Sequence, residues 1–426
     1  MNVCTLLISG VFCLFSYTFC ILGLLNNIKP IQYNGMKRIL FISMYFFPER
    51  GSSDYYIDDI RSFLTSNGFD ISVVTPNPVR DLDYDTIEKY KRLELEPYGD
   101  LRVYRLYCGS NSSNSVLNRL KRISVYKRKL KKFLKLNHSQ FDYIYIPSNP
   151  PIFIPLMVES LCKKYGIKSI YAITDLWPQI IGKYNFLKGK SSKAIKCADK
   201  VVTLSEDMKR SIQLVSDRKD IEIIRIWPHQ SIFEKSKCSS FDYSFLNESK
   251  FNIFYIGNIG QFQSIDLLLD VAKEMIGEEK YHFYFVGGGR KYAEISQRVN
   301  EESLTNVTII HRVSNEVASS LYRSSNLNII SLGKGNINYA CPSKTSTCIY
   351  SNTKCLMIVD KSKYSEELLV NPNFALDSSY DVKHIAQTIR DISADDRVIS
   401  ENNQIKMYDK DVNLNKWLDI FGGCSE

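Results

Sequence analysis

Two segments of the chain, about two hundred residues apart, begin in the same way. Residues 38–53 (RILFISMYFFPERGSS) run an apolar strand into a turn of Pro, Gly and Ser, and residues 251–260 (FNIFYIGNIG) run a second strand into a glycine turn. A helical pattern follows each turn. An apolar strand that ends in a glycine turn before a helix is typical of a parallel α/β sheet, in which helix N-termini face a crevice. The chain therefore predicts two nucleotide-binding folds that face each other across a cleft.

The division of the chain follows from these two starts, and 426 residues suffice for two domains with full cores. We predict a first domain over 36–229, a second over 230–398, and a helical segment over 399–426 that crosses back. Strands alternate with helices in both domains, which favours doubly wound parallel sheets. The polar, tyrosine-rich stretch 77–100 is predicted to be a loop. The predicted strands are 38–44, 70–75, 101–107, 142–146, 168–173, 199–204 and 221–226, then 251–256, 281–286, 307–310, 326–331 and 355–359.

The composition is that of a globular protein, with 44% hydrophobic and 24% charged residues. The eleven cysteines are scattered, with no CxxC pair and no metal-ligand spacing. They are expected to be reduced thiols in a cytosolic environment. No HxH, HExxH or acidic-triad pattern indicates a metal site, so none is predicted.

The first 35 residues form a separate apolar segment. Residues 1–25 carry no charged side chain, and that length would cross a bilayer, which needs about 20 residues. Cations follow at Lys29, Lys37 and Arg38, an orientation that would leave the rest of the chain in the cytoplasm. A cleaved secretory signal is disfavoured because a charged N-terminal region is missing. Two interpretations stay open, a membrane anchor and a natural start at Met36.

A basic segment accounts for the whole net charge of +9, because residues 115–138 carry nine cations and no acid. Its apolar residues recur at helical spacing. A basic amphipathic helix fits an anionic membrane surface, whereas nucleic acid is a poorer fit without a recognition motif. The plainer alternative is a solvated face of the domain. The predicted membrane contacts are Arg119, Arg122, Lys127, Arg128, Lys131 and Lys132, on the cytoplasmic face of the inner (plasma) membrane.

An ordered set of motifs carries a resemblance to a known family. PERGSS stands near the start, DLWP (175–178) in mid-domain, YIGNIGQFQS at the second start, and FVGGG, NVTII and PSK (342–344) follow in order. Over about residues 36–421 the chain resembles the retaining glycosyltransferases of family 4, which have the GT-B fold. The likeness is greatest to the bacterial branch for colanic acid, O-antigen and capsular polysaccharides. The resemblance implies transfer from a nucleotide-sugar donor to a lipid-linked saccharide acceptor, without a cofactor or an essential divalent metal.

The resemblance also implies where the donor binds. Glycines let backbone N–H groups approach a diphosphate closely, although an ordinary strand–helix turn would need them too. Many family members carry a lysine where this chain has Gln263. Arg290 could add charge or could be solvated. The donor contacts expected here are Gly257, Asn258, Gly260 and Gln263, then Gly288, Gly289 and Arg290, with Gly51 and Ser52 opposite across the cleft.

The PSK motif is the sharpest of the set. Pro342 pre-sets the first helical turn, Ser343 can cap the helix, and Lys344 would meet the donor phosphates, unless it is simply solvated. Many relatives carry two glutamates eight positions apart that hold ribose and sugar. This chain has Tyr339 and Thr347 at the matching positions. Sugar contacts would then come from Thr345, Ser346 and Thr347, or activity would be impaired.

Asp175, in the DLWP motif, follows a strand of the first domain, where parallel sheets place ligands. It could hold an acceptor hydroxyl or stabilise charge at the reacting centre, or it could be a plain turn residue. We take Asp175 and Lys344 as the candidate catalytic residues. Two alternatives to a glycosyltransferase remain: a UDP-sugar 2-epimerase, which shares the fold, and a non-catalytic GT-B subunit of a polysaccharide assembly complex.

Overall fold

The computed structural model describes residues 35–49, 54–80, 82–91, 93–110, 115–148, 153–181, 187–234, 238–239, 241–395 and 406–422. The predicted donor contacts Gly51 and Ser52 and the apolar residues 1–34 lie outside the described residues. Within the described part of the chain, no helix is long and apolar enough to cross a membrane. The chain divides into two compact units, Met1–Lys37 and Arg38–Glu426, and both sheets of the protein belong to the second unit.

The first sheet has eight strands in the order β3-β4-β2-β1-β5-β6-β7-β8. All neighbouring pairs are parallel except β3 and β4. The chain runs outward from β1 in one direction and from β5 in the other, so the strand order reverses between these two central strands. The strands are β1 (Arg38–Ile42), β2 (Asp70–Pro76), β3 (Leu95–Tyr98), β4 (Leu101–Leu106), β5 (Tyr143–Pro147), β6 (Lys168–Ile173), β7 (Lys200–Thr203) and β8 (Ile221–Ile223).

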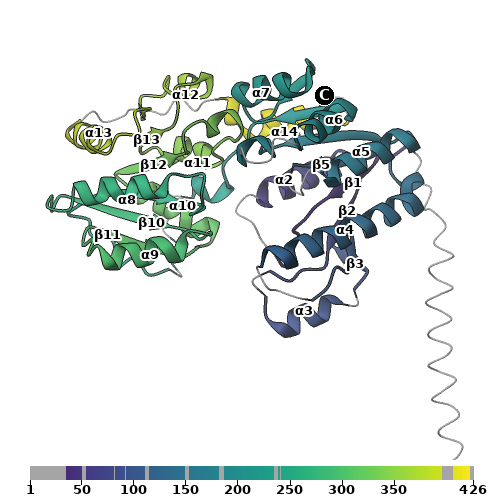
Figure 1. Ribbon diagram of the computed structural model, residues 1–426, viewed down its shortest axis with the longest axis horizontal. Helices are drawn as coiled ribbons and strands as arrows, with labels where there is room; N and C mark the ends of the chain where they lie inside the picture. The colour runs from purple at the N-terminus through teal and green to yellow at the C-terminus, as the bar shows by residue number, and fades with distance from the viewer. Residues whose placement is uncertain are drawn as a thin grey trace, which may run out of the picture. The chain divides into compact units, whose positions relative to one another are not determined.

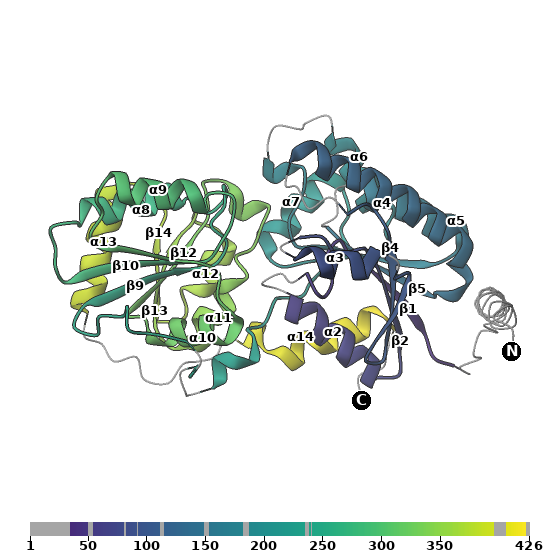
Figure 2. The same ribbon diagram turned by 90° about the horizontal axis from the view of Figure 1, so that it is seen from below.

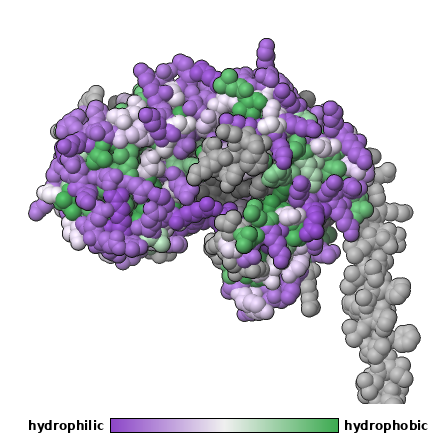
Figure 3. Space-filling view, viewed as in Figure 1, coloured by the Kyte–Doolittle hydropathy of each residue, from purple (hydrophilic) through white to green (hydrophobic). Residues whose placement is uncertain are grey.

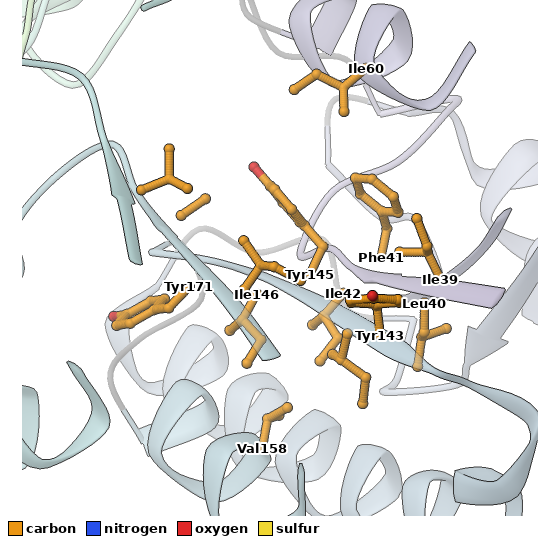
Figure 4. Packing of buried hydrophobic residues seen from close by; sticks show 14 of the residues in the cluster. Ile39, Leu40, Phe41, Ile42, Ile60, Tyr143, Tyr145, Ile146, Val158 and Tyr171 are labelled. Carbon is orange, nitrogen blue, oxygen red and sulfur yellow. The ribbon is translucent and has the colours of Figure 1, made fainter. Parts of the chain in front are cut away.

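Helices cover both faces of this sheet (Figures 1 and 2). On one face lie α2 (Asp54–Ser66) and α14 (Lys410–Ile420). On the other lie α4 (Val116–Asn137), α5 (Phe153–Tyr165), α6 (Lys188–Cys197) and α7 (Glu206–Ser216). Figure 4 shows Ile60 of α2 and Val158 of α5 on opposite sides of the central strands. Between them Phe41 stacks on Tyr145 with ring centroids 4.6 Å apart, so β1 and β5 are buried on both faces, as their apolar sequences predict.

The second sheet has six parallel strands in the order β11-β10-β9-β12-β13-β14. The strand order reverses between β9 and β12. The strands are β9 (Phe251–Ile256), β10 (Tyr281–Val286), β11 (Val307–Ile310), β12 (Leu327–Ser331), β13 (Lys354–Ile358) and β14 (Phe374–Asp377). The helices are α8 (Ile265–Glu274), α9 (Tyr292–Glu301), α10 (Asn315–Ser324), α11 (Lys344–Ser351), α12 (Lys363–Leu368) and α13 (Val382–Ala394). Separate apolar clusters lie on the two faces of the sheet, one with α8 and α13 and the other with α10, α11 and α12.

The last helix, α14, packs against the first sheet rather than the second. Trp417 and Phe421 are fully buried in the core of the first sheet, and Trp417 Nε1 donates to the hydroxyl of Tyr56 at 3.1 Å. The predicted domain boundaries at 229 and 398 stay predictions. Hydrophilic residues cover most of the face seen in Figure 3, as expected when apolar side chains fill both cores.

The stretch 77–100 is not the loop predicted from its polarity. It contains α3 (Tyr84–Lys91) and β3, which pairs antiparallel with β4 at the edge of the sheet. The buried guanidinium of Arg105 in β4 holds Glu96 of β3 at 2.6 Å. Backbone pairing with the adjacent strand β4 and this ion pair hold the strand, rather than an apolar pattern, so hydrophobic periodicity could not reveal it. Strand β14 is also additional to the strands predicted from the sequence.

Candidate functional site

The central feature of the second domain is the meeting of two segments at the carboxyl edge of its sheet. The turn that begins at Gly257 follows β9, and α11 follows β12, the neighbour of β9 across the reversal of strand order. Ligands of doubly wound sheets bind at such reversals, outside the carboxyl ends of the strands. A Cβ built on Gly257 would lie 2.9 Å from Lys344 Nζ. The topology thus brings the predicted glycine turn and the predicted lysine together.

The turns after β9 and β10 pack backbone against backbone. Gly287 has a φ of +154°, and a Cβ at this position would collide with the carbonyl oxygen of Gly257. The N–H of Ile259 donates to the carbonyl oxygen of Gly288 at 2.9 Å. Only glycine tolerates both this φ and this contact. The glycine run after β10 is therefore required to hold the first turn in place, whatever it binds.

Lys344 has an unusual environment for a lysine. Its Nζ is buried, has no hydrogen-bond partner, and lies 3.6 Å from the centroid of the Tyr255 ring. The aromatic face offers a favourable contact to a cation, but burial dominates and lowers the pKa of Lys344 to about 7. The hydroxyl of Tyr255 donates to the carbonyl oxygen of Asn258 at 2.7 Å, which ties the same ring to the glycine turn. An anion beside Nζ would supply the missing acceptor and stabilise the charged lysine.

The start of α11 differs from the sequence prediction. Ser343 has helical backbone angles (φ −59°, ψ −26°) and its side chain makes no capping hydrogen bond, so the predicted Ser343 cap is wrong. Pro342 and Thr345 are buried, and the Thr345 hydroxyl accepts a hydrogen bond from Tyr364. Thr345 therefore points into the protein, away from the Lys344 cluster. Thr347 is half-buried, and its contact with a donor stays a prediction.

The other predicted donor contacts lie along the two glycine turns. Asn258 Nδ2 donates to Gln263 Oε1 at 3.4 Å. Gly260 lies between these side chains, because a Cβ there would lie 2.6 Å from Asn258 Nδ2 and 2.7 Å from Gln263 Oε1. Gly289 packs against the same turn, and a Cβ on it would lie 2.7 Å from Asn258 Oδ1. A Cβ on Gly288 would instead lie 3.8 Å from Arg312 Cβ, and Arg290 is exposed.

Asp175 lies after β6, and its loop is paired with the segment that leads into α11. The N–H of Asp175 donates to Ser148 Oγ at 3.2 Å. Asp175 and Ala340 form an antiparallel bridge, beside a hydrogen bond from Leu176 N–H to the carbonyl oxygen of Tyr339. The Asp175 side chain reaches solvent, yet the protein packed around it displaces enough water to raise its pKa to about 6. A carboxyl with such a pKa can hold or accept a proton near neutral pH.

A pocket of about 440 Å³ opens between the carboxyl end of β1 and the loop after β11. Its walls are rich in aromatic side chains from the first domain, with two arginines and two acids. Arg312, on its second-domain side, adjoins Gly288. Sequence reasoning missed this pocket and also Tyr255, which looks like an ordinary strand residue. The lining residues are Ser43, Tyr45, Phe46, Phe47, Tyr55, Ile57, Asp58, Arg61, Tyr98, His229 and Arg312 to Glu316.

The predicted membrane contacts on α4 differ in how far their side chains are exposed. Arg119, Arg128, Lys131 and Lys132 are exposed, and Lys127 is half-buried. Arg122 donates to the carbonyl oxygens of Gly109 and Asn77, so it fastens α4 to the domain instead of facing outward. Among the described residues, no group of three or more His, Cys, Asp or Glu side chains is placed to hold a metal ion. Metal independence stays a prediction.

Comparison with known proteins yields likenesses of structure only. No family model matches the chain, and no curated protein matches it. Sucrose-phosphate synthase from Thermosynechococcus elongatus superposes with a TM-score of 0.69 at 14% identity, over 90% of this chain and 98% of that one. WaaG, a glycosyltransferase involved in lipopolysaccharide biosynthesis, superposes with a TM-score of 0.65 at 11% identity, over 90% of this chain and 100% of that one. HepE from Anabaena, in complex with UDP-glucose, superposes with a TM-score of 0.63 at 14% identity, over 90% of this chain and 99% of that one.

Proposed function

Because the chain has the GT-B fold, we propose that it is a retaining glycosyltransferase of the family 4 type that moves a sugar from a nucleotide-sugar donor to a lipid-linked oligosaccharide. The observation that carries the proposal is the buried Nζ of Lys344, which lacks a hydrogen-bond partner beside the Gly257 turn. The likeness to HepE, solved with UDP-glucose, supports a nucleotide-sugar donor. The likeness to WaaG, from lipopolysaccharide biosynthesis, supports a role in cell-surface polysaccharide synthesis.

The donor diphosphate is the group that this part of the site can stabilise. As the sugar–phosphate bond breaks, negative charge develops on the departing diphosphate. Lys344 supplies a positive charge at that position, and the glycine turn lets backbone N–H groups approach the phosphate oxygens without a side chain between them. No cofactor or metal is required by this scheme, since the lysine and the backbone dipoles carry the compensation.

The acceptor would bind on the side of the first domain. Asp175 stands in the loop that pairs with residues 339–340, directly before α11, so the acceptor hydroxyl it holds would face the donor sugar. Its carboxylate would orient that hydroxyl and stabilise positive charge at the anomeric carbon. The aromatic pocket beside Arg312 offers flat apolar faces of the kind on which pyranose rings stack.

A non-catalytic subunit is the second candidate, favoured by one observation. Tyr339 stands where many relatives have a sugar-binding glutamate, and its carbonyl oxygen is engaged by the N–H of Leu176. Thr347 stands at the second such position. A chain that binds the nucleotide but has lost its sugar contacts would retain Lys344 and the glycine turns and transfer nothing.

Donor turnover separates the two candidates. We expect the purified full chain to bind UDP or GDP. We also expect it to hydrolyse at least one sugar nucleotide slowly, in a panel that includes UDP-glucose, and so to release the nucleoside diphosphate. Mass spectrometry of lipid-linked intermediates in a deletion strain should show an acceptor that lacks one sugar. Nucleotide binding without donor hydrolysis or transfer would favour the non-catalytic subunit, and the failure of every nucleotide to bind would overturn both.

A further inference from the structure

Three neighbouring helices of the first domain form a positively charged surface. Helices α4, α5 and α6 lie side by side on one face of the sheet (Figures 1 and 2). We call their cationic side chains the basic face. Arg122 is left out because it binds carbonyl oxygens of the domain, and the basic face comprises Arg119, Lys121, Lys127, Arg128, Lys129, Lys131, Lys132 and Lys135 of α4, Lys163 and Lys164 of α5, and Lys188, Lys190, Lys193 and Lys196 of α6. The sequence pattern points to α4 alone.

The three helices contain a single carboxyl group, and it does not offset this charge. Glu159 of α5 is fully buried, and its Oε2 accepts a hydrogen bond from Ser169 Oγ at 2.6 Å. Burial raises its pKa to about 8, which keeps it protonated at neutral pH. One lysine at the end of the basic face, Lys196, pairs at 3.2 Å with Asp217, which follows α7. The face is therefore strongly positive at its surface.

Helix α4 combines these cations with exposed apolar side chains. Its inner side, with Tyr126, Leu130 and Leu134, is buried in the core. On its outer sides Leu117 and Leu120 are 79% and 58% exposed near the start of the helix. Leu136 is 69% exposed near its end. Leucines that face water among lysines are the residues that enter the headgroup and acyl boundary when a helix lies on a bilayer.

The basic face also reaches the edge of the sheet that carries the candidate site. Phe153 is the first residue of α5, which follows the carboxyl end of β5. Lys127 Nζ lies 5.6 Å and Lys190 Nζ 4.7 Å from the centroid of its ring. These contacts place α4, α5 and α6 together at that edge. The loop that carries Asp175 leaves the same edge, after β6.

We propose that the basic face docks on an anionic lipid bilayer, with its lysines and arginines among the headgroup phosphates and the α4 leucines below them. The attractions of separate cations to such a surface add up, so several together give stable residence. The exposed leucines favour a bilayer over a nucleic acid, because a phosphate backbone offers no apolar region for them to enter. This inference deepens the proposed function, because docking would present the carboxyl edge of the sheet to an acceptor held in the membrane.

Vesicle binding tests the inference without any activity assay. The protein from Met36, which contains the second compact unit and every described helix and strand, would be sedimented with phosphatidylcholine vesicles with and without about 30% phosphatidylglycerol. Docking predicts binding to the anionic vesicles, release as salt rises, and little binding to neutral ones. Equal binding to both vesicle types, or no binding to anionic vesicles at low salt, would overturn the proposal.

Substitutions locate the surface. Lys188→Gln, Lys190→Gln and Lys193→Gln together remove three exposed cations from α6 and should weaken anionic-vesicle binding at least about tenfold. Leu117→Ser with Leu120→Ser should also weaken it. The matched control, Lys361→Gln, Lys383→Gln and Lys406→Gln, makes the same charge change on exposed lysines outside the basic face. Equal losses in the control and α6 variants would overturn the proposal, as would tighter binding to duplex DNA than to anionic vesicles.

The same variants distinguish a failure of the docking proposal from a failure of the proposed function. UDP affinity of the α6 variant should match that of the unaltered protein, which also shows that it is folded. If the unaltered protein binds anionic vesicles as described but transfers no sugar, docking stands and the proposed function fails. If the α6 variant loses no vesicle affinity while transfer is normal, docking alone fails.

Discussion

The backbone N–H of Leu176 donates a hydrogen bond to the carbonyl oxygen of Tyr339 at 2.7 Å. Leu176 follows Asp175, and Tyr339 stands five residues before Lys344, so one backbone contact joins the segments that carry the two candidate catalytic residues. The adjoining bridge between Asp175 and Ala340 extends this contact. A donor group on Lys344 and an acceptor group on Asp175 would thus be positioned by a shared piece of main chain rather than by flexible side chains.

Removal of the Lys344 ammonium should damage transfer. We expect Lys344→Ala to lower kcat/KM about a hundredfold or more, because a charged contact to the departing diphosphate contributes about 2–4 kcal/mol. Steady-state kinetics with a sugar-nucleotide donor would measure this. The exposed Lys383 of α13 offers a matched control, since Lys383→Ala should leave the rate unchanged. A near-normal rate in folded Lys344→Ala would show that α11 does not hold the diphosphate.

Binding of UDP should take up a proton at alkaline pH. The pKa of Lys344 is lowered to about 7 in the free protein, so its ammonium is present below pH 7 and lost as the pH rises above it. A diphosphate binds the charged form, and affinity should therefore fall by up to about tenfold per pH unit above pH 7. Calorimetry in two buffers of different ionisation enthalpy would reveal the proton uptake. Lys344→Met should abolish it, and uptake that persists in this variant would assign the proton to another group.

Asp175 should act on the transfer step and not on donor binding. Asp175→Asn keeps the shape of the side chain, and we expect the transfer rate to fall about a hundredfold with UDP affinity within about twofold of normal. Because the protein packed around Asp175 displaces water and raises its pKa to about 6, the rate in the unaltered protein should fall as the pH drops below about 6. A pH–rate profile with no acidic limb, together with an active Asp175→Asn protein, would make Asp175 a turn residue only.

Transfer activity should survive chelation. The proposed function has Lys344 and the N–H groups of the turn after β9 compensate the diphosphate charge, so we expect the rate in EDTA to equal the rate in Mg²⁺ within about twofold. Activity would be measured after dialysis against EDTA and again after addition of Mg²⁺ or Mn²⁺. Complete loss that either cation restores would refute compensation by lysine and dipoles.

Glu159 should weaken the fold as the pH rises. Its pKa is raised to about 8, mainly by burial, so the folded protein keeps a proton that the unfolded chain releases above its ordinary carboxyl pKa of about 4.3. Stability is therefore highest at low pH with respect to this group and declines as the pH rises toward 8. Glu159→Gln should raise the unfolding midpoint at pH 8 and change it little at pH 5. An equal shift at both pH values would point to packing rather than to the proton.

The sequence predicted most of the sheet strands because their central residues are buried on both faces. The apolar runs 38–42 and 251–256 were sufficient to identify their strands. The glycines after β9 and β10 were predicted to admit a diphosphate, which stays a prediction, and the structure shows that Gly287 packs against the carbonyl oxygen of Gly257. The predictions that failed concerned features without an apolar pattern. Backbone pairing with β4 and the ion pair between Arg105 and Glu96 hold β3, and Ser343 makes no cap because its own backbone is already helical.

The sequence identified residues of the candidate site but not the side chains that surround them. Lys344 could be picked from its motif, yet its contact with Tyr255 depends on β9 and β12 being neighbours in the sheet. Arg312 could have been found, because it follows the end of β11 at the carboxyl edge where ligands gather. The contribution of α6 to the basic face required knowing that it lies beside α5.

The position of α14 has a consequence for how this chain can be made. Trp417 and Phe421 fill the interior of the first sheet, while the polypeptide between that sheet and α14 builds the whole second sheet. The core of the first sheet is therefore incomplete until α14 has been synthesised and has packed against it. A first half that ends after β8 would lack the Trp417 and Phe421 side chains of its core. A self-sufficient first half would need α14 grafted directly behind β8.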